Sequence, residues 1–272
     1  MTAVRDATGR ELVLRHPPRR VVSLVPSLTE TVFALGRADV LAGVTRYCIE
    51  PKGSVERLER VGGTKNPDLD RIRALQPDLV LLNAEENRQD DFAALQADGV
   101  TLFVSFPKRV RDVIELIRAL GVLIDAREAA EKIAAQLDET LAEIGARPFV
   151  TQRPRVFCPI WKNPWMGFSS DTYAGDMLAV AGATNVLSER AERYCEVTLE
   201  EVAAAAPQVV LLPDEPYVFK QKDLPGLTAL SGTPAWQNSQ VRFIDGKALS
   251  WFGSRTASGL RYLAQILRQS RL

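Results

Sequence analysis

The chain has 272 residues, of which 34 are basic and 34 are acidic, so its formal net charge is zero. Because no long run of either sign occurs, a nucleic-acid surface and a polybasic membrane patch are both disfavoured. No apolar stretch approaches the roughly 18 residues of a transmembrane helix, and the hydrophobic content of 46% is that of an average globular protein.

The first 122 residues alternate apolar runs with amphipathic segments. We expect strands at 11–14, 21–25, 40–45, 78–83 and 100–105, and helices at about 27–36, 69–75, 89–97 and 109–120. The runs are apolar throughout instead of alternating with polar residues, which predicts a parallel sheet covered on both faces. Ser27 and Glu30 have the spacing of a capping box at the start of the first helix.

A stretch rich in alanine and glutamate follows at 125–144, with apolar residues at helical spacing and no glycine or proline. It predicts one long, stiff helix. Beyond it the pattern restarts, with strands expected near 155–160, 208–212 and 241–244 and a helix at 256–267. We therefore divide the chain into a lobe at 1–122, a linking helix at 123–147 and a second lobe at 148–272, and expect only small opening motions.

The two lobes resemble each other in sequence. Residues 70–83 read as a short helix, a proline and a buried strand, and residues 200–213 repeat this pattern. Asp70 precedes Pro77 by the same seven positions as Glu200 precedes Pro207. The sequence thus predicts an α/β protein of two Rossmann-like lobes with parallel sheets, joined by one long rigid helix, with a ligand cleft between the lobes.

Common catalytic signatures are missing from the sequence. It has no phosphate-binding loop, dinucleotide fingerprint, nucleophile elbow or zinc-protease motif, and its one histidine, His16, lies beside two prolines. Cys48, Cys158 and Cys195 cannot all pair and lack the spacing of a zinc site. We expect no catalytic residue, no metal site and no cofactor, and three inert thiols, with a thiol role across the cleft as the alternative.

Aromatic and polar residues instead follow the predicted strands, where α/β lobes usually hold ligands. Singly, a loop tryptophan more often covers local core, Arg255 could equally form a local salt bridge, and Glu85 and Glu86 could be acids of a helical first turn. Several such positions together favour a flat, largely apolar ligand. The expected contacts are Tyr47, Asn83, Glu85, Glu86, Trp161, Trp165, Tyr194, Trp251 and Arg255.

Several strings resemble those of substrate-binding proteins with a helical backbone, which serve ABC importers of cobalamin, haem and iron-siderophores. They are RVVSLVPSLTETVFALG (20–36), GVTRYCIEP (43–51), VGGTKNPDLD (61–70), WKNPW (161–165), DTYAGDMLAVAGATNV (171–186) and SWFGSRT (250–256). The resemblance spans nearly the whole chain and is strongest to the cobalamin-binding branch. It implies a monomeric receptor that binds a corrinoid or another metal chelate and docks on an ABC permease.

Within that branch, aromatic pocket positions correspond to Tyr47, Tyr194 and Trp251. Two tryptophan positions of the branch's first lobe correspond here to Gly63–Thr64 and to Asn83, which leaves the identity of the ligand open. The resemblance also implies that an acidic residue of each lobe docks on arginines of the permease; Asp70 and Glu200 match these positions. Both follow an expected N-cap, Asp68 or Thr198.

Two other functions remain open. One is an enzyme of the same two-lobed architecture, for which Glu85 or Glu86 would be the acid or base. The other is an intracellular carrier or sensor, because residues 1–14 do not have the pattern of a secretion signal. We expect a periplasmic or extracellular location if a signal has been removed, and a cytoplasmic one otherwise.

Overall fold

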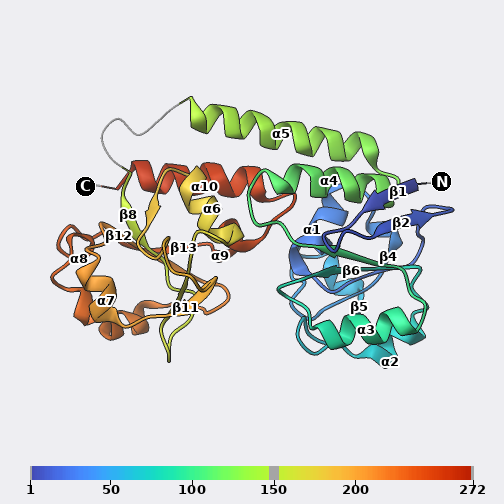
Figure 1. Ribbon diagram of the computed structural model, residues 1–272, viewed down its shortest axis with the longest axis horizontal. Helices are drawn as coiled ribbons and strands as arrows, with labels where there is room; N and C mark the ends of the chain where they lie inside the picture. Colours follow the sequence, from blue (N-terminus) through green and yellow to red (C-terminus); the bar gives the residue numbers. More distant parts are fainter. Residues whose placement is uncertain (1, 147–152, 271–272) are drawn as a thin grey trace. The chain divides into compact units, whose positions relative to one another are not determined.

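The computed structural model describes residues 2–146 and 153–270 and divides into two compact units. Unit 1 contains Met1–Pro107, Arg111–Gln136 and Phe252–Arg255, and unit 2 contains Lys108–Val110, Leu137–Trp251 and Thr256–Leu272. The boundary expected between residues 147 and 148 lies outside the described residues. Each unit is built of parallel strands and helices, so the predicted α/β class is confirmed (Figure 1).

Unit 1 is organised around a five-stranded parallel sheet with the order β5-β4-β3-β6-β7. A short antiparallel pair, β1 and β2, precedes it. Its elements are β1 (Thr2–Arg5), β2 (Glu11–Leu14), β3 (Val21–Ser23), α1 (Pro26–Ala34), η1 (Ala38–Val40), β4 (Leu41–Val44), η2 (Val55–Arg57), β5 (Glu59–Arg60), α2 (Leu69–Ala74), β6 (Leu79–Asn83), α3 (Gln89–Ala97), β7 (Leu102–Ser105) and α4 (Asp112–Leu123).

Helices cover both faces of this sheet. On one face, Val80 and Leu82 of β6 pack with Ile72 of α2 and Leu95 of α3 in a core where these four side chains are at most 2% exposed. On the other face lie α1 and α4 (Figure 1). Every residue of β6 is buried, which explains why its sequence is apolar without alternation.

Unit 2 contains a four-stranded parallel sheet with the order β10-β8-β12-β13 and a two-stranded antiparallel sheet of β9 and β11. Its elements are β8 (Arg155–Phe157), β9 (Met166–Phe168), α6 (Tyr173–Val180), β10 (Thr184–Asn185), β11 (Tyr194–Glu196), α7 (Leu199–Ala204), β12 (Val209–Pro213), η3 (Gln221–Leu230), α8 (Pro234–Gln237), β13 (Val241–Ile244), α9 (Gly246–Ser250) and α10 (Thr256–Arg268).

The central strand β12 is buried along its whole length, as β6 is in unit 1. Val210 and Leu212 pack against Val202 of α7 and Leu227 of η3. The predicted long helix is confirmed as α5 (Arg127–Gly145), and the division between the units falls within it. Among the described residues, no helix has both the length and the apolarity that crossing a membrane requires.

The sequence repeat is a structural repeat with the same hydrogen bonds in both units. Arg20 donates from Nε to the Leu75 carbonyl at the end of α2, and Arg155 donates from Nε to the Ala205 carbonyl at the end of α7. The next residues, Gln76 and Ala206, both adopt a left-handed backbone, with φ of 46° and 45°. In both units an arginine at the start of a parallel strand, β3 or β8, therefore satisfies the carbonyl at the end of a helix.

Helix starts agree with the sequence in two of three cases. The Asp68 side chain accepts from the Arg71 amide and the Thr198 side chain from the Glu201 amide, so both expected N-caps are confirmed. The capping box expected at Ser27 is wrong, because α1 begins one residue earlier at Pro26, with Val25 as its N-cap. Proline suits this first position, since it has no amide hydrogen to satisfy.

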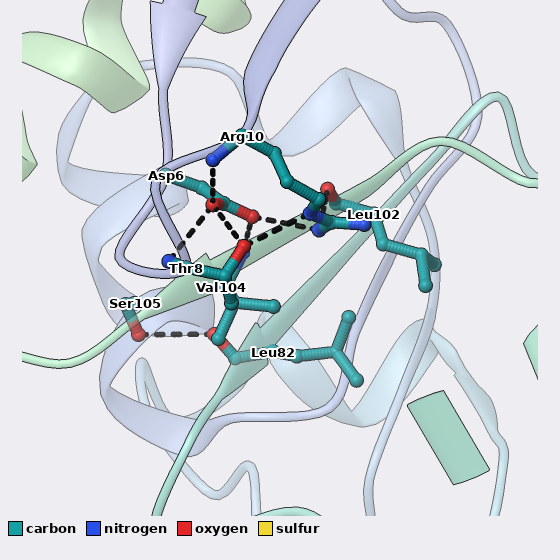
Figure 2. Close-up of polar contacts among 7 residues, drawn as sticks. All are labelled: Asp6, Thr8, Arg10, Leu82, Leu102, Val104 and Ser105. Atoms are coloured by element: carbon teal, nitrogen blue, oxygen red, sulfur yellow. Dashed lines mark hydrogen bonds and ion pairs between the residues drawn. The ribbon is translucent and has the colours of Figure 1, made fainter. Parts of the chain in front are cut away.

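Asp6 fastens the β1–β2 pair to the edge strand β7 (Figure 2). Its carboxylate accepts from the Thr8 amide at 2.9 Å, the Thr8 hydroxyl at 2.6 Å and the Arg10 guanidinium at 2.7 Å. It also accepts from the Val104 amide of β7 at 3.4 Å, while Arg10 donates to the Leu102 carbonyl. A single buried carboxylate thus holds both the turn and its attachment to the sheet.

We expect Asp6→Ala to lower the free energy of unfolding by about 1–3 kcal/mol, because buried donors would lose their acceptor. Urea denaturation followed by circular dichroism measures this change. Asp39→Ala is the matched control, since the Asp39 side chain is exposed and pairs only at the surface with Arg37. Equal stability of the two variants would contradict a structural role for Asp6.

Candidate functional site

Exposed apolar side chains gather in the loops that leave the carboxyl ends of the parallel strands. In an open α/β sheet this edge is the usual place for a ligand. The exposed residues there are Tyr47 and Ile49 after β4, Trp161 after β8 and Val218 after β12. Tyr194, also exposed, opens β11. Large apolar surface left in water is typical of a binding surface.

The loop that carries Tyr47 is anchored on both sides of this residue. Cys48 is fully buried, with its sulfur 3.2 Å from the Thr29 hydroxyl and 3.3 Å from the Thr45 hydroxyl. Arg60 donates to the Thr45 and Cys48 carbonyls, at 2.9 Å in each case. Because its neighbours are held in this way, Tyr47 remains 52% exposed at the surface of unit 1.

Asn83, at the end of β6, is buried and bonded within its own loop. Its side-chain oxygen accepts from the Glu85 amide at 2.8 Å and the Glu86 amide at 3.1 Å, and its nitrogen donates to the Ser105 hydroxyl at 3.2 Å. Both glutamates are half-buried in the turn that it shapes. The structure therefore gives Asn83 a role in positioning the turn, and its contact with a ligand stays a prediction.

Asn87, which the sequence did not single out, completes this turn. Its side-chain oxygen accepts from the Asn83 amide at 2.8 Å, and its nitrogen donates to the carbonyls of Thr64 at 2.9 Å and Leu24 at 3.3 Å. One buried amide thereby connects three loops at the carboxyl edge of the unit 1 sheet. Its partner carbonyls are distant in sequence, so no local pattern predicts it.

The two tryptophans expected after β8 belong to one aromatic cluster in unit 2. Trp165 stacks on the buried Phe219, with centroids 5.9 Å apart and planes inclined by 3°. Tyr217 packs on Phe219 at 4.6 Å, and Trp161 meets Tyr217 edge to face at 5.6 Å and 79°. The sequence reading missed Tyr217, although its loop follows β12 as the Asn83 loop follows the equivalent strand β6.

Tyr194 lies beside a charged cluster of unit 2. It opens β11, where it pairs with Phe168 of β9, and it is 43% exposed. Next to it, Arg193 pairs with Asp171 at 2.6 Å, and Lys108 pairs with the same carboxylate at 3.0 Å. These two cations lower the pKa of the Asp171 carboxyl, with the hydrogen bond from Arg193 as the largest cause.

Trp251 and Arg255 have internal partners. Trp251 is 5% exposed, and its indole Nε1 donates to Glu215 of the loop after β12 at 2.7 Å. Burial raises the pKa of the Glu215 carboxyl, and the hydrogen bond from Trp251 opposes that rise. Arg255, in unit 1, donates from Nε to Glu30 of α1 at 3.0 Å. Arg255 thus forms a salt bridge, but its partner is 225 residues away in sequence, so this is not the local pair left open by the sequence. Ligand contacts of both residues stay predictions.

Within residues 2–146 and 153–270, no group of three or more His, Cys, Asp or Glu side chains is placed to hold a metal ion. All three cysteines are free and buried. Burial is the largest cause of the raised pKa of each thiol.

Comparison with known proteins gives close structural counterparts. A vitamin B12-binding protein of Vibrio parahaemolyticus is 29% identical over 195 residues, which cover 72% of this chain and 70% of that protein. The periplasmic vitamin B12 binding protein BtuF of Vibrio cholerae has the same fold, with a TM-score of 0.82, 23% identity, and coverage of 93% of this chain and 98% of BtuF.

A second solved structure is the periplasmic heme-binding protein BhuT in complex with two hemes. Its TM-score is 0.80 at 28% identity, and the match covers 93% of this chain and 100% of BhuT. The model of the family described as periplasmic binding protein matches residues 21–248, which is most of the sequence. The chain therefore belongs to the periplasmic binding protein family.

Proposed function

We propose that this chain is the solute-binding component of an ABC importer and that it binds a corrinoid or a related flat metal chelate without changing it chemically. The observation that carries the proposal is the exposure of three aromatic rings: Tyr47 and Trp161, in loops otherwise held by buried anchors, and Tyr194, at the start of β11. Aromatic rings suit the face of a flat macrocycle, because stacking buries a large apolar area with little loss of side-chain freedom.

The named relatives support this class of ligand. Vitamin B12 and heme, which appear in their names, are both flat metal-containing macrocycles. In this chain each exposed ring also has a basic neighbour in sequence, namely Arg46, Lys162 and Arg193. An aromatic ring beside a cation suits a macrocycle with anionic or polar groups at its rim.

The first unit explains one departure from the cobalamin-binding branch. A Cβ at Gly63 would lie 2.4 Å from the Asn66 side-chain oxygen and 3.0 Å from the Arg46 guanidinium, so a tryptophan could not replace this glycine without displacing both. Tyr47, in the loop after β4 and with the Arg46 guanidinium 5.1 Å from its ring centroid, is an aromatic group that unit 1 retains. The cleft expected between the lobes, which would combine rings of both, stays a prediction from the sequence.

Because the relatives are periplasmic by name, we propose a periplasmic or extracellular location for this chain as well. The enzyme alternative would require Glu85 or Glu86 to act on the bound ligand. It predicts turnover, whereas a receptor releases its ligand unchanged.

A binding screen tests the proposal. We expect the purified protein to bind cobalamin, cobinamide or haem at one saturable site with quenching of tryptophan fluorescence, and to release the chelate unaltered. Trp161→Ala should weaken binding by about 1–3 kcal/mol, because a large ring contact is lost. Trp236→Phe, in the partly buried α8, is the matched control and should bind as the wild type does.

If none of these chelates nor a ferric siderophore binds at micromolar concentration, the proposed ligand class is wrong. If Trp161→Ala binds with the affinity of the wild type, Trp161 does not contact the ligand. Chemical conversion of a bound chelate would favour the enzyme.

We also propose that Asp70 and Glu200 dock on basic residues of the permease. They occupy the second positions of α2 and α7, the equivalent helices of the repeat. The Asp70 side chain is 91% exposed but pairs with Arg73 at 2.8 Å, and Arg73 also pairs with Asp98. Since Arg73 competes with any permease arginine, Asp70 should contribute less to docking than Glu200 does.

Reconstitution with the cognate permease in proteoliposomes tests this asymmetry through ligand-dependent ATP hydrolysis. Glu200→Ala should reduce stimulation more than Asp70→Ala, and the double variant most, all with unchanged ligand affinity. Asp39→Ala is the surface control. Normal stimulation of ATP hydrolysis by the double variant would contradict the docking role. The two carboxylates would then only stabilise the N-termini of their helices, by about 0.3–1 kcal/mol each.

A further inference from the structure

Asp223 is a buried carboxylate beneath the exposed aromatic surface of unit 2. It is 1% exposed and belongs to the first turn of η3. Its oxygens accept from the Lys162 ammonium, from the Tyr217 hydroxyl at 3.3 Å and from the Lys220 amide at 2.8 Å. The hydrogen bond from Lys162 is the largest cause of the lowered pKa of Asp223, which favours the charged carboxylate.

These partners come from two different loops. Lys162 follows β8, and Tyr217 and Lys220 follow β12, the strand that pairs with β8 in the sheet. The Lys162 ammonium also lies 5.6 Å from the centroid of the Tyr217 ring. Asp223 is therefore the point at which the two aromatic loops of this sheet edge are tied to each other.

The contacts of Asp223 also determine how the solvent-exposed rings are held. Trp161, adjacent to Lys162, is 44% exposed and packs edge to face on the half-buried Tyr217. Tyr217 in turn rests on the buried Phe219. The Trp161 backbone is bridged to Met166, but without a fixed Lys162 and Tyr217 its ring would rest on a mobile neighbour. Ligand binding would then have to order both rings.

We propose that Asp223 is a positioning residue for ligand binding: by fixing Lys162 and the Tyr217 hydroxyl, it presents Trp161 and Tyr217 as one preorganised aromatic surface for the face of a flat ligand. This inference rests on the function proposed above. The competing reading is that Asp223 only caps η3, through its bond to the Lys220 amide.

Asp223→Asn separates the two readings, because asparagine can still accept from the Lys220 amide but cannot form the ion pair with Lys162. We expect it to weaken binding of the best chelate from the screen about tenfold. In a Trp161→Ala background the same change should cost clearly less than this tenfold loss, because only Tyr217 of the two rings that it positions remains. Lys162→Met, which keeps the aliphatic stem, should behave like Asp223→Asn.

Glu143→Gln is the matched control, because it breaks an exposed ion pair of unit 2, with Arg261, away from the rings. It should bind as the wild type does. An equal loss of affinity from Asp223→Asn with and without Trp161, or no loss at all, would overturn the proposal.

A readout without ligand makes the outcome independent of the proposed function. In protein labelled with 5-fluorotryptophan, the Trp161 fluorine resonance, assigned with Trp161→Phe, should shift and sharpen in Asp223→Asn as the ring gains mobility. The Trp236 resonance should not move. An unchanged Trp161 resonance would refute the positioning role, whereas failure of every chelate to bind the wild type would refute only the proposed ligand.

Discussion

Complete burial of the two central strands is the constraint on which the rest of the structure depends. Residues of β6 and β12 are buried on both faces, so helices must cover each sheet on both sides. Parallel strands joined through helices end at a common edge, and the loops at that edge lie outside the packed layers. This is why exposed rings and their buried anchors occur there, at Tyr47 with Cys48 and at Trp161 with Asp223.

Features with a local signature could be predicted from the sequence. The longer parallel strands, such as β6 and β12, followed from unbroken apolar runs, whereas the short strands β5 and β9–β11 were not expected. The helix α5 followed from helical spacing without glycine or proline, and the caps at Asp68 and Thr198 from short polar side chains before a helix. The capping box predicted at Ser27 was wrong because the helix begins one residue earlier, with Pro26. Asp223 could not be found, since its partner Lys162 is 61 residues away and no periodicity relates them.

Two polar residues expected to contact the ligand illustrate a second limit of prediction from sequence. Asn83 and Arg255 have the chemistry of ligand-binding groups, yet the structure uses both internally, one in a turn and one in an ion pair with Glu30. Burial imposes this, because a buried polar group without a partner is costly. An exposed apolar side chain needs no hydrogen-bond partner inside the protein, so the exposure of Trp161 and Tyr47 is better evidence of a ligand-binding surface.

The buried state of the three thiols has a practical consequence. Cys48, Cys158 and Cys195 are all enclosed, and burial keeps them protonated by raising their pKa. Maleimide and similar reagents attack the accessible thiolate, so they should spare the native cysteines. A single cysteine introduced beside one of the exposed rings would then carry a dye alone, which would turn the protein into a reagentless optical sensor for its solute.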